Sequence, residues 1–174
     1  MEMEKKMKHN VLWIEDGAFV EISNFSGPVT ITRKYDLRVA MDVADAVKQI
    51  QLTEFDAVIV DIRLPPGTDR DWESFHSNLI KSKIPTRLGL QLLFSLLKPM
   101  DCAVKLNHIP SWISPEKFGV FTVEGEKEIM VDLKKLGIAF YRQKKLDIPS
   151  NTLLELIETI IKGSKQTSNP GGQK

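Results

Sequence analysis

Cysteine is nearly absent from this chain of 174 residues, and long apolar runs are missing altogether. The single cysteine, Cys102, cannot form a disulfide within the chain, which excludes a disulfide-stapled secreted scaffold and is typical of a reducing compartment. We interpret Cys102 as a small buried apolar residue. The longest apolar stretch, residues 88–97, is far shorter than the roughly 20 residues that a membrane span requires. The sequence therefore favours a soluble protein.

A bias of charge is missing as well. Lys and Arg number 24 and Asp and Glu number 23, so we expect neither direct binding of nucleic acid nor attachment to an acidic membrane. Residues 1–8 form a charged N-terminal tail without the apolar segment of a signal peptide, which predicts a cytoplasmic location. The glycine motifs of dinucleotide-binding and P-loop proteins are also absent. The length predicts one domain with a sizeable core.

What the sequence does contain is an alternation of strand-like and helix-like segments. We predict strands over residues 10–14, 37–41, 55–60, 118–122 and 138–142. We predict helices over residues 18–25, 43–52, 88–97 and 127–136, and from Pro149-Ser150 to Gly163. Gly27-Pro28 breaks the first of these helices before an extended segment 29–32, Asp42 caps the second, and Gly137 ends the fourth. We predict that residues 164–174 form a disordered tail. This alternation predicts an α/β fold, an open parallel sheet with helices on both faces.

Acidic residues follow two of the predicted strands directly. The apolar run 57–60 ends in Asp61, before a Pro-Pro-Gly turn, and the run 11–14 ends in Glu15 and Asp16. Sheets of this kind bind ligands beyond the carboxyl ends of their strands. If the two strands are parallel neighbours, three carboxylates converge there and repel one another unless a cation binds. The sequence therefore predicts a divalent metal site.

These acids belong to a longer series at the ends of predicted strands. In chain order, the series is Glu15-Asp16, Asp61 with Leu64-Pro65, Thr122, Tyr141 and Lys144. The series resembles the receiver domain of two-component response regulators, over about residues 10–162. The resemblance implies a flavodoxin-like, doubly wound sheet of five parallel strands in the order 2-1-3-4-5, with residues 9–163 as the domain. The segment 18–25 implies an atypical first helix.

For the metal, the resemblance implies Mg²⁺ beside a phosphoacceptor aspartate. Asp61 stands at the position of the acceptor, which takes a phosphoryl group onto its carboxylate. Glu15 and Asp16 match the acidic pair that holds the metal, with Asp61 and the backbone carbonyl of Arg63 as further ligands. Magnesium suits this set because it is a hard cation that takes a few oxygen ligands and keeps several waters.

The resemblance also implies roles for three residues near the acceptor. Lys144 matches the lysine that pairs with the acceptor and with phosphoryl oxygens, and Thr122 matches the hydroxyl that bonds the phosphoryl group. Tyr141 matches the aromatic switch residue that turns inward when that hydroxyl moves. Taken singly, Thr122 is also an ordinary strand residue, Lys144 fits a solvated surface and Tyr141 fits a core.

The implied function is signalling rather than enzymatic. The phosphodonor would be a sensor histidine kinase or a phosphotransfer protein, the downstream protein is unknown, and a homodimer is possible. No output domain is visible after Gly163. We therefore expect either a stand-alone receiver or a fragment of a longer regulator.

Four residues near the series depart from, or vary within, the receiver pattern. Lys145 stands where receivers have a proline in a cis peptide bond, and a cis bond is costly before any other residue. Val123 stands where a small residue is preferred, and its bulk could restrict access. Arg63 and Glu124 flank the site where the family tunes phosphoryl lifetime, and we hypothesise that they pair and shield the acyl phosphate from water.

The interval from Asp61 to Thr122 spans 61 residues, about twice what receivers show. Two insertions account for it, at about residues 68–87 and 99–116. The first carries Trp72 and Phe75 among charges, the composition of a partner surface or a flap, and we prefer partner selection over a roof on the acceptor. The plain alternative is loops packed on the sheet. Two isolated histidines, His76 and His108, do not make a metal site.

Two other functions stay open. An aspartate-nucleophile phosphatase also places Asp after a strand, but it requires a second acid two residues later, where Arg63 stands. The stronger alternative is a receiver-like interaction module that has kept the fold and lost phosphorylation. The complete series of site residues favours phosphorylation, while Lys145 and Val123 keep the alternative open.

Overall fold

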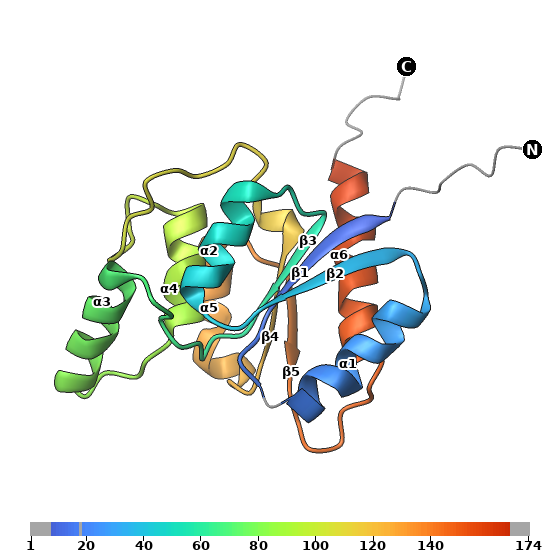
Figure 1. Cartoon of the computed structure of the whole chain (residues 1–174), viewed down its shortest axis with the longest axis horizontal. Helices are drawn as coiled ribbons and strands as arrows, with labels where there is room; N and C mark the ends of the chain where they lie inside the picture. The colour runs from blue at the N-terminus through green and yellow to red at the C-terminus, as the bar shows by residue number, and fades with distance from the viewer. Residues whose placement is uncertain (1–7, 18, 168–174) are drawn as a thin grey trace, which may run out of the picture.

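The computed structural model describes residues 8–17 and 19–167. The predictions for the tail residues 1–7 and 168–174 lie outside this part of the chain. A five-stranded, all-parallel sheet forms the centre, in the order β2-β1-β3-β4-β5 (Figure 1). Its strands are β1 (His9–Ile14), β2 (Tyr35–Ala40), β3 (Ala57–Val60), β4 (Phe118–Thr122) and β5 (Phe140–Gln143). The predicted fold class and strand order are confirmed.

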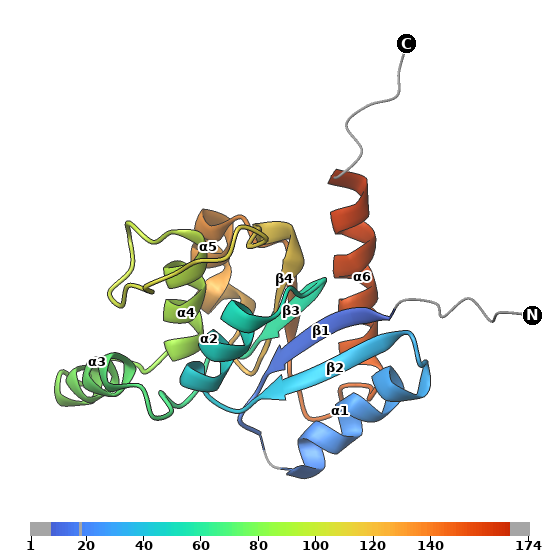
Figure 2. The ribbon, with the colours of Figure 1, turned by 45° about the horizontal axis from the view of Figure 1, so that its top comes forward.

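Helices cover both faces of the sheet. They are α1 (Phe19–Ile31), α2 (Val43–Leu52), α3 (Arg70–Lys81), α4 (Leu88–Leu97), α5 (Glu126–Leu136) and α6 (Thr152–Thr167), with a short 3-10 turn, η1 (Pro115–Lys117). Figures 1 and 2 show α1 and α6 on one face and α2, α4 and α5 on the other. None of the helices in the described residues has the length and apolar character needed to cross a membrane.

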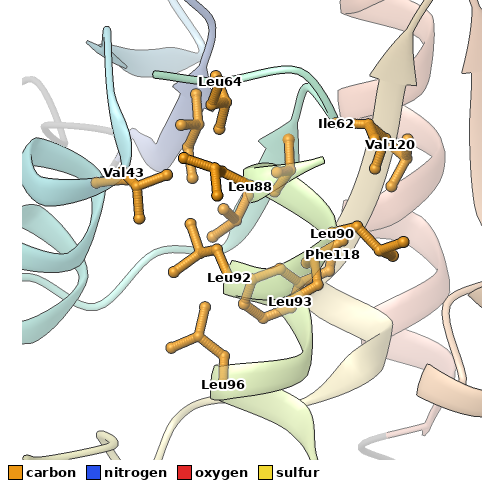
Figure 3. Packing of buried hydrophobic residues seen from close by; sticks show 14 of the residues in the cluster. Val43, Ile62, Leu64, Leu88, Leu90, Leu92, Leu93, Leu96, Phe118 and Val120 are labelled. Carbon is orange, nitrogen blue, oxygen red and sulfur yellow. The ribbon is translucent and has the colours of Figure 1, made fainter. Parts of the chain in front are cut away.

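The apolar core is divided by the sheet into two layers. Along β1, Val11 and Trp13 point into the layer under α1 and α6, whereas Leu12 and Ile14 point into the layer under α2, α4 and α5. This alternation is what a strand buried on both faces requires. In Figure 3 the leucines of α4 fill the second layer against Val43 and Phe118. The apolar stretch 88–97 is thus a core helix, as predicted.

Two helices run further than predicted. Helix α1 continues through Pro28 to Ile31, so the predicted break at Gly27-Pro28 and the extended segment 29–32 are wrong. Phe25 and Val29 are buried on one side of this helix against the sheet, and this burial outweighs the hydrogen bond that Pro28 cannot donate.

Helix α6 continues past Gly163 to Thr167, so the predicted end at Gly163 is wrong, as is disorder over residues 164–167. A Cβ at position 163 would lie 2.9 Å from Cζ of Phe140, so glycine serves close packing there and not a helix end.

Cys102 is only partly buried, contrary to its interpretation as a buried residue, and its Sγ lies 3.2 Å from the Pro99 carbonyl oxygen.

The two insertions lie in different parts of the molecule. The first contains α3, which begins at the side-chain cap of Asp69 and is attached to the core by the buried Trp72. Figures 1 and 2 place α3 beyond α4, away from the strand ends, so α3 does not form a roof over Asp61 at the end of β3. The second packs as an irregular loop, with Trp112 against Phe55 (ring centroids 6.0 Å apart).

Candidate functional site

The register of the sheet brings the predicted acids together. In the pairing of β1 with β3, Ile14 lies opposite Val60, so Glu15 and Asp61 leave the sheet at the same level. The Asp61 amide donates to the Ile14 carbonyl (3.0 Å), which continues the ladder to Asp61 itself. Parallel strands thus deliver both acids to one edge, as predicted from the apolar runs.

Glu15, Asp16 and Asp61 form one cluster. Each offers a carboxylate oxygen, and these atoms lie within 4.8 Å of one another. Glu15 and Asp61 are buried, at 1% and 5% exposed, while Asp16 is exposed. A second oxygen of Glu15 is engaged locally, because Oε1 accepts a hydrogen bond from the Gly17 amide (2.9 Å).

Lys144 supplies the positive charge of this cluster. Its Nζ donates to Glu15 Oε2 and to Asp61 Oδ2 (3.1 Å), and it lies 3.7 Å from Glu21 Oε1. The backbone of β5 positions it, since the Lys144 amide donates to the Thr122 carbonyl (2.7 Å). Burial alone would lower the pKa of Lys144, but attraction to Asp61 and Glu15 outweighs burial and raises that pKa above its usual value. Lys144 therefore stays charged.

The negative charges of the acids are only partly compensated by Lys144, as the pKa values of Glu15 and Asp16 show. Burial raises the pKa of Glu15 to about 7, and repulsion from Asp61 adds to the rise against the opposing attraction of Lys144. Burial and repulsion from Asp61 also raise the pKa of Asp16. Three oxygen donors with excess negative charge fit a hard divalent cation such as Mg²⁺. The donor set of this chain therefore fits the implied metal.

Glu21 was not singled out from the sequence. It lies in the first turn of α1, 39% of its side chain is exposed, and its carboxylate faces Lys144. It also lines a cavity of about 450 Å³ with Asn24, Lys144, Lys145 and others beside the acidic cluster. The available signal was its place in the helix that directly follows the acid pair. That place alone does not show that the Glu21 side chain faces Lys144.

Thr122 and Tyr141 lie on the adjacent strands β4 and β5, where Tyr141 pairs with Val120, two residues before Thr122. Thr122 is fully buried, and its Oγ1 accepts a hydrogen bond from the Glu124 amide at 3.4 Å. Tyr141 packs against the core layer of α4 and α5, and its hydroxyl donates to the Glu124 carbonyl (2.7 Å). The tyrosine is therefore partly buried, and its hydroxyl is bonded to the loop that follows Thr122.

The hypothesised pair of Arg63 and Glu124 is present. Arg63 Nε donates to Glu124 Oε1 at 2.6 Å, and the Arg63 amide donates to Asp61 Oδ1 at 3.3 Å, so Arg63 borders Asp61 directly. Arg87, which was not singled out, donates from Nη2 to Glu124 Oε2 (3.1 Å). Burial alone would raise the pKa of Glu124, but the hydrogen bond from Arg63 and the charges of Arg87 and Arg63 lower that pKa below its usual value.

The loop after β5 differs from the receiver pattern as expected. No cis peptide bond occurs in residues 8–17 and 19–167, so the bond between Lys144 and Lys145 is trans. Val123 is half exposed. His76 and His108 contribute to no cluster of metal-ligating side chains within the described residues.

No profile of a known protein family matches this chain, and no curated protein matches it in sequence. Solved structures do match. A response regulator from Thermotoga maritima has a TM-score of 0.56 at 14% identity, covering 90% of this chain and 99% of its own. The signal receiver domain of a putative LuxO repressor protein from Vibrio parahaemolyticus has a TM-score of 0.56 at 18% identity, covering 96% and 100%. This chain has the receiver-domain fold.

The chemotaxis response regulator CheY4 of Vibrio cholerae gives the same result, with a TM-score of 0.57 at 17% identity over 88% of this chain and 99% of its own. At identities this low, the structural matches establish the fold alone. The chemistry of the site must be argued from the residues of this chain. In this receiver fold the acidic cluster, Lys144 and Thr122 occupy the carboxyl edge of the sheet, where α/β sheets bind their ligands.

Proposed function

We propose that this chain is a phosphoacceptor in two-component signal transduction, phosphorylated on Asp61 with Mg²⁺ present and switching the binding of a partner. One observation carries the proposal: Asp61 lies with two further acids within 4.8 Å and with Lys144 at 3.1 Å, on a receiver fold. A carboxylate, a cation and a metal-type acidic pair are what phosphoryl transfer to a side chain needs, because the reaction depends mainly on positioning and charge neutralisation.

In the proposed step, an Asp61 carboxylate oxygen attacks the phosphorus of a phosphohistidine or of a small acyl phosphate. The new O–P bond forms as the donor's P–N or P–O bond breaks, and the donor leaves with that electron pair. Lys144 faces Asp61 Oδ2 and would neutralise phosphoryl charge as a compact cation. Thr122 would donate its hydroxyl to a phosphoryl oxygen.

Glu15, Asp16 and Asp61 are the proposed Mg²⁺ ligands, with the Arg63 carbonyl as a further one. The bound ion would supply positive charge against the phosphoryl oxygens. Without it, burial and mutual repulsion raise the pKa values of Glu15 and Asp16. The chain's own residues thus hold a surplus of negative charge that Lys144 balances only in part.

The proposed donor is a sensor histidine kinase or a phosphotransfer protein in the cytoplasm. We propose that the inserted segment 68–87 helps select it. This segment follows the loop after Asp61 in the chain and contains α3, which lies beyond α4 (Figure 1). The side chains of Ile80 and Ile84 are more than half exposed. The proposed role is that of a signalling acceptor rather than an enzyme.

The test is incubation with acetyl phosphate and Mg²⁺, followed by intact mass. The proposal expects a gain of one phosphoryl group in the native chain, loss of that gain when the metal is chelated, and no gain in Asp61→Asn. Asp56→Asn is the matched control, since Asp56 is a partly exposed acid before β3, outside the cluster, and should leave the gain intact. No gain in the native chain would favour the receiver-like module that is not phosphorylated.

A further inference from the structure

Glu124 connects four parts of the molecule. Its amide donates to Thr122, and its carbonyl accepts from Tyr141. Its carboxylate accepts from Arg63, in the loop after the acceptor, and from Arg87, the last residue of the inserted segment 68–87. A single buried residue therefore contacts the hydroxyl and tyrosine near the acceptor, the acceptor loop and the insertion.

Arg87 is linked to the acceptor by the backbone as well. It occupies the N-cap position of α4, and two residues later the Gly89 amide donates to the Ile62 carbonyl (3.0 Å). A Cβ on Gly89 would lie 1.8 Å from the Asp61 carbonyl oxygen, so the first turn of α4 lies directly on the acceptor backbone. Close packing of this kind transmits small displacements.

The two arginines share Glu124 unequally. The side chain of Glu124 is 2% exposed, whereas that of Arg63 is 65% exposed and that of Arg87 is 29% exposed. Arg63 can therefore move more freely than its partners. Arg87 Nε is buried and has no hydrogen-bond partner among the described residues, which leaves a donor ready for a second bond. Arginine commonly uses such a donor pair in a two-pronged bond to one carboxylate.

We propose that Glu124 and Arg87 couple phosphorylation of Asp61 to the inserted segment, and this inference rests on the proposed function. A phosphoryl group adds negative charge beside Arg63, whose amide already bonds Asp61. Arg63 turns toward that charge and gives up its share of Glu124. The Glu124 carboxylate then binds Arg87 with both oxygens and holds the junction of the insertion with α4, residues 82–90, more firmly. The insertion thus changes its local stability according to whether Asp61 is phosphorylated.

Hydrogen exchange followed by mass spectrometry tests the coupling. The native protein is compared with and without acetyl phosphate in the presence of Mg²⁺, and intact mass gives the phosphorylated fraction of each sample. We expect amides in residues 82–90 to exchange at least about fivefold more slowly after phosphorylation, the lower end of the usual coupling between sites. Arg87→Gln should lose this slowing at an equal phosphorylated fraction.

Arg70→Gln is the matched control, because Arg70 is an exposed arginine of the same insertion and pairs with no acid in the described residues. It should keep the slowing. Arg87→Lys keeps the positive charge but cannot form the two-pronged bond, so this variant should lose most of the slowing of exchange in residues 82–90. It provides a second test if Arg87→Gln does not fold. Unchanged exchange in the phosphorylated native protein, or equal slowing in Arg87→Gln, would overturn the coupling. Absence of any mass gain would overturn the proposed function instead.

Discussion

At the residue scale, the site is a set of buried charges whose positions follow from where strands end. Glu15 and Asp61 each come directly after an apolar run, so their convergence could be predicted from the sequence together with a parallel sheet. Glu21 and Arg87 could not be found this way. Their roles depend on where α1 and the inserted segment lie in space, and no spacing along the chain encodes that.

Arg63 provides a prediction about the lifetime of the phosphoryl group. It borders Asp61 through its amide and reaches across to Glu124, so it covers the acceptor whether it pairs with Glu124 or with the phosphoryl group. We expect Arg63→Ala to shorten the half-life of the acyl phosphate about fivefold, the effect of about 1 kcal/mol on a barrier. The measurement is the decay of phosphorylated mass after removal of donor, with Arg38→Ala as a control distant from the site. A lifetime equal to the native one would refute shielding.

Glu124 provides a prediction about stability and pH. Its pKa is lower in the folded state, so its contribution is present above the unfolded value of about 4.5 and is lost as pH falls through the folded value. Glu124→Gln leaves Arg87 without its buried partner, and we expect a loss of about 2 kcal/mol at pH 7, reduced from a fully buried pair because Arg63 is exposed.

Urea unfolding of the native chain and of Glu124→Gln at pH 7 and pH 3.5 measures this effect. The difference between the two proteins should shrink at the lower pH, because pH 3.5 lies below the unfolded pKa value of about 4.5, so Glu124 is mostly protonated in the unfolded chain and must lose that proton on folding. A difference that stayed constant between the two pH values would show that the charge of Glu124 contributes nothing to folding.

At the scale of elements, the errors of sequence-based prediction have physical causes. A proline inside α1 suggested a helix break, but tertiary burial of Phe25 and Val29 holds the helix together. The recurrence of Ile22, Phe25 and Val29 at helical spacing was the available signal. Strongly apolar elements such as α4 and β4 were predicted with their observed bounds, because their burial agrees with their local pattern.

The start of α4 against the acceptor backbone gives a prediction with a built-in control. Gly89→Ala places a methyl group against the Asp61 carbonyl, and we expect a loss of about 3 kcal/mol, as for severe overpacking. Gly27→Ala, also in a helix, meets nothing within 4 Å and should gain about 0.5 to 1 kcal/mol. Thermal or urea unfolding of both variants measures the contrast. A Gly89→Ala variant as stable as Gly27→Ala would show that α4 does not lie on the acceptor strand as described.

At the scale of the whole molecule, the sheet order and the two helical layers could be predicted because alternating strands and helices admit few arrangements. The placement of the two insertions could not, because their composition fits either a flap or a packed loop. The structure separates them: the first ends at Arg87, which bonds Glu124 beside the candidate site, and the second packs Trp112 on Phe55. Of the two insertions, the segment 68–87 is thus the one that reaches the candidate site.

The central claim is that Asp61 itself takes a phosphoryl group, and the most direct test is to locate the modification. The native chain is treated with acetyl phosphate and Mg²⁺ and reduced with borohydride, which converts an aspartyl phosphate into homoserine. It is then digested with trypsin, which releases residues 49–63 as one peptide that contains both Asp56 and Asp61. Fragmentation should place homoserine at position 61 alone, and an unmodified Asp61 or homoserine at another aspartate would contradict the account.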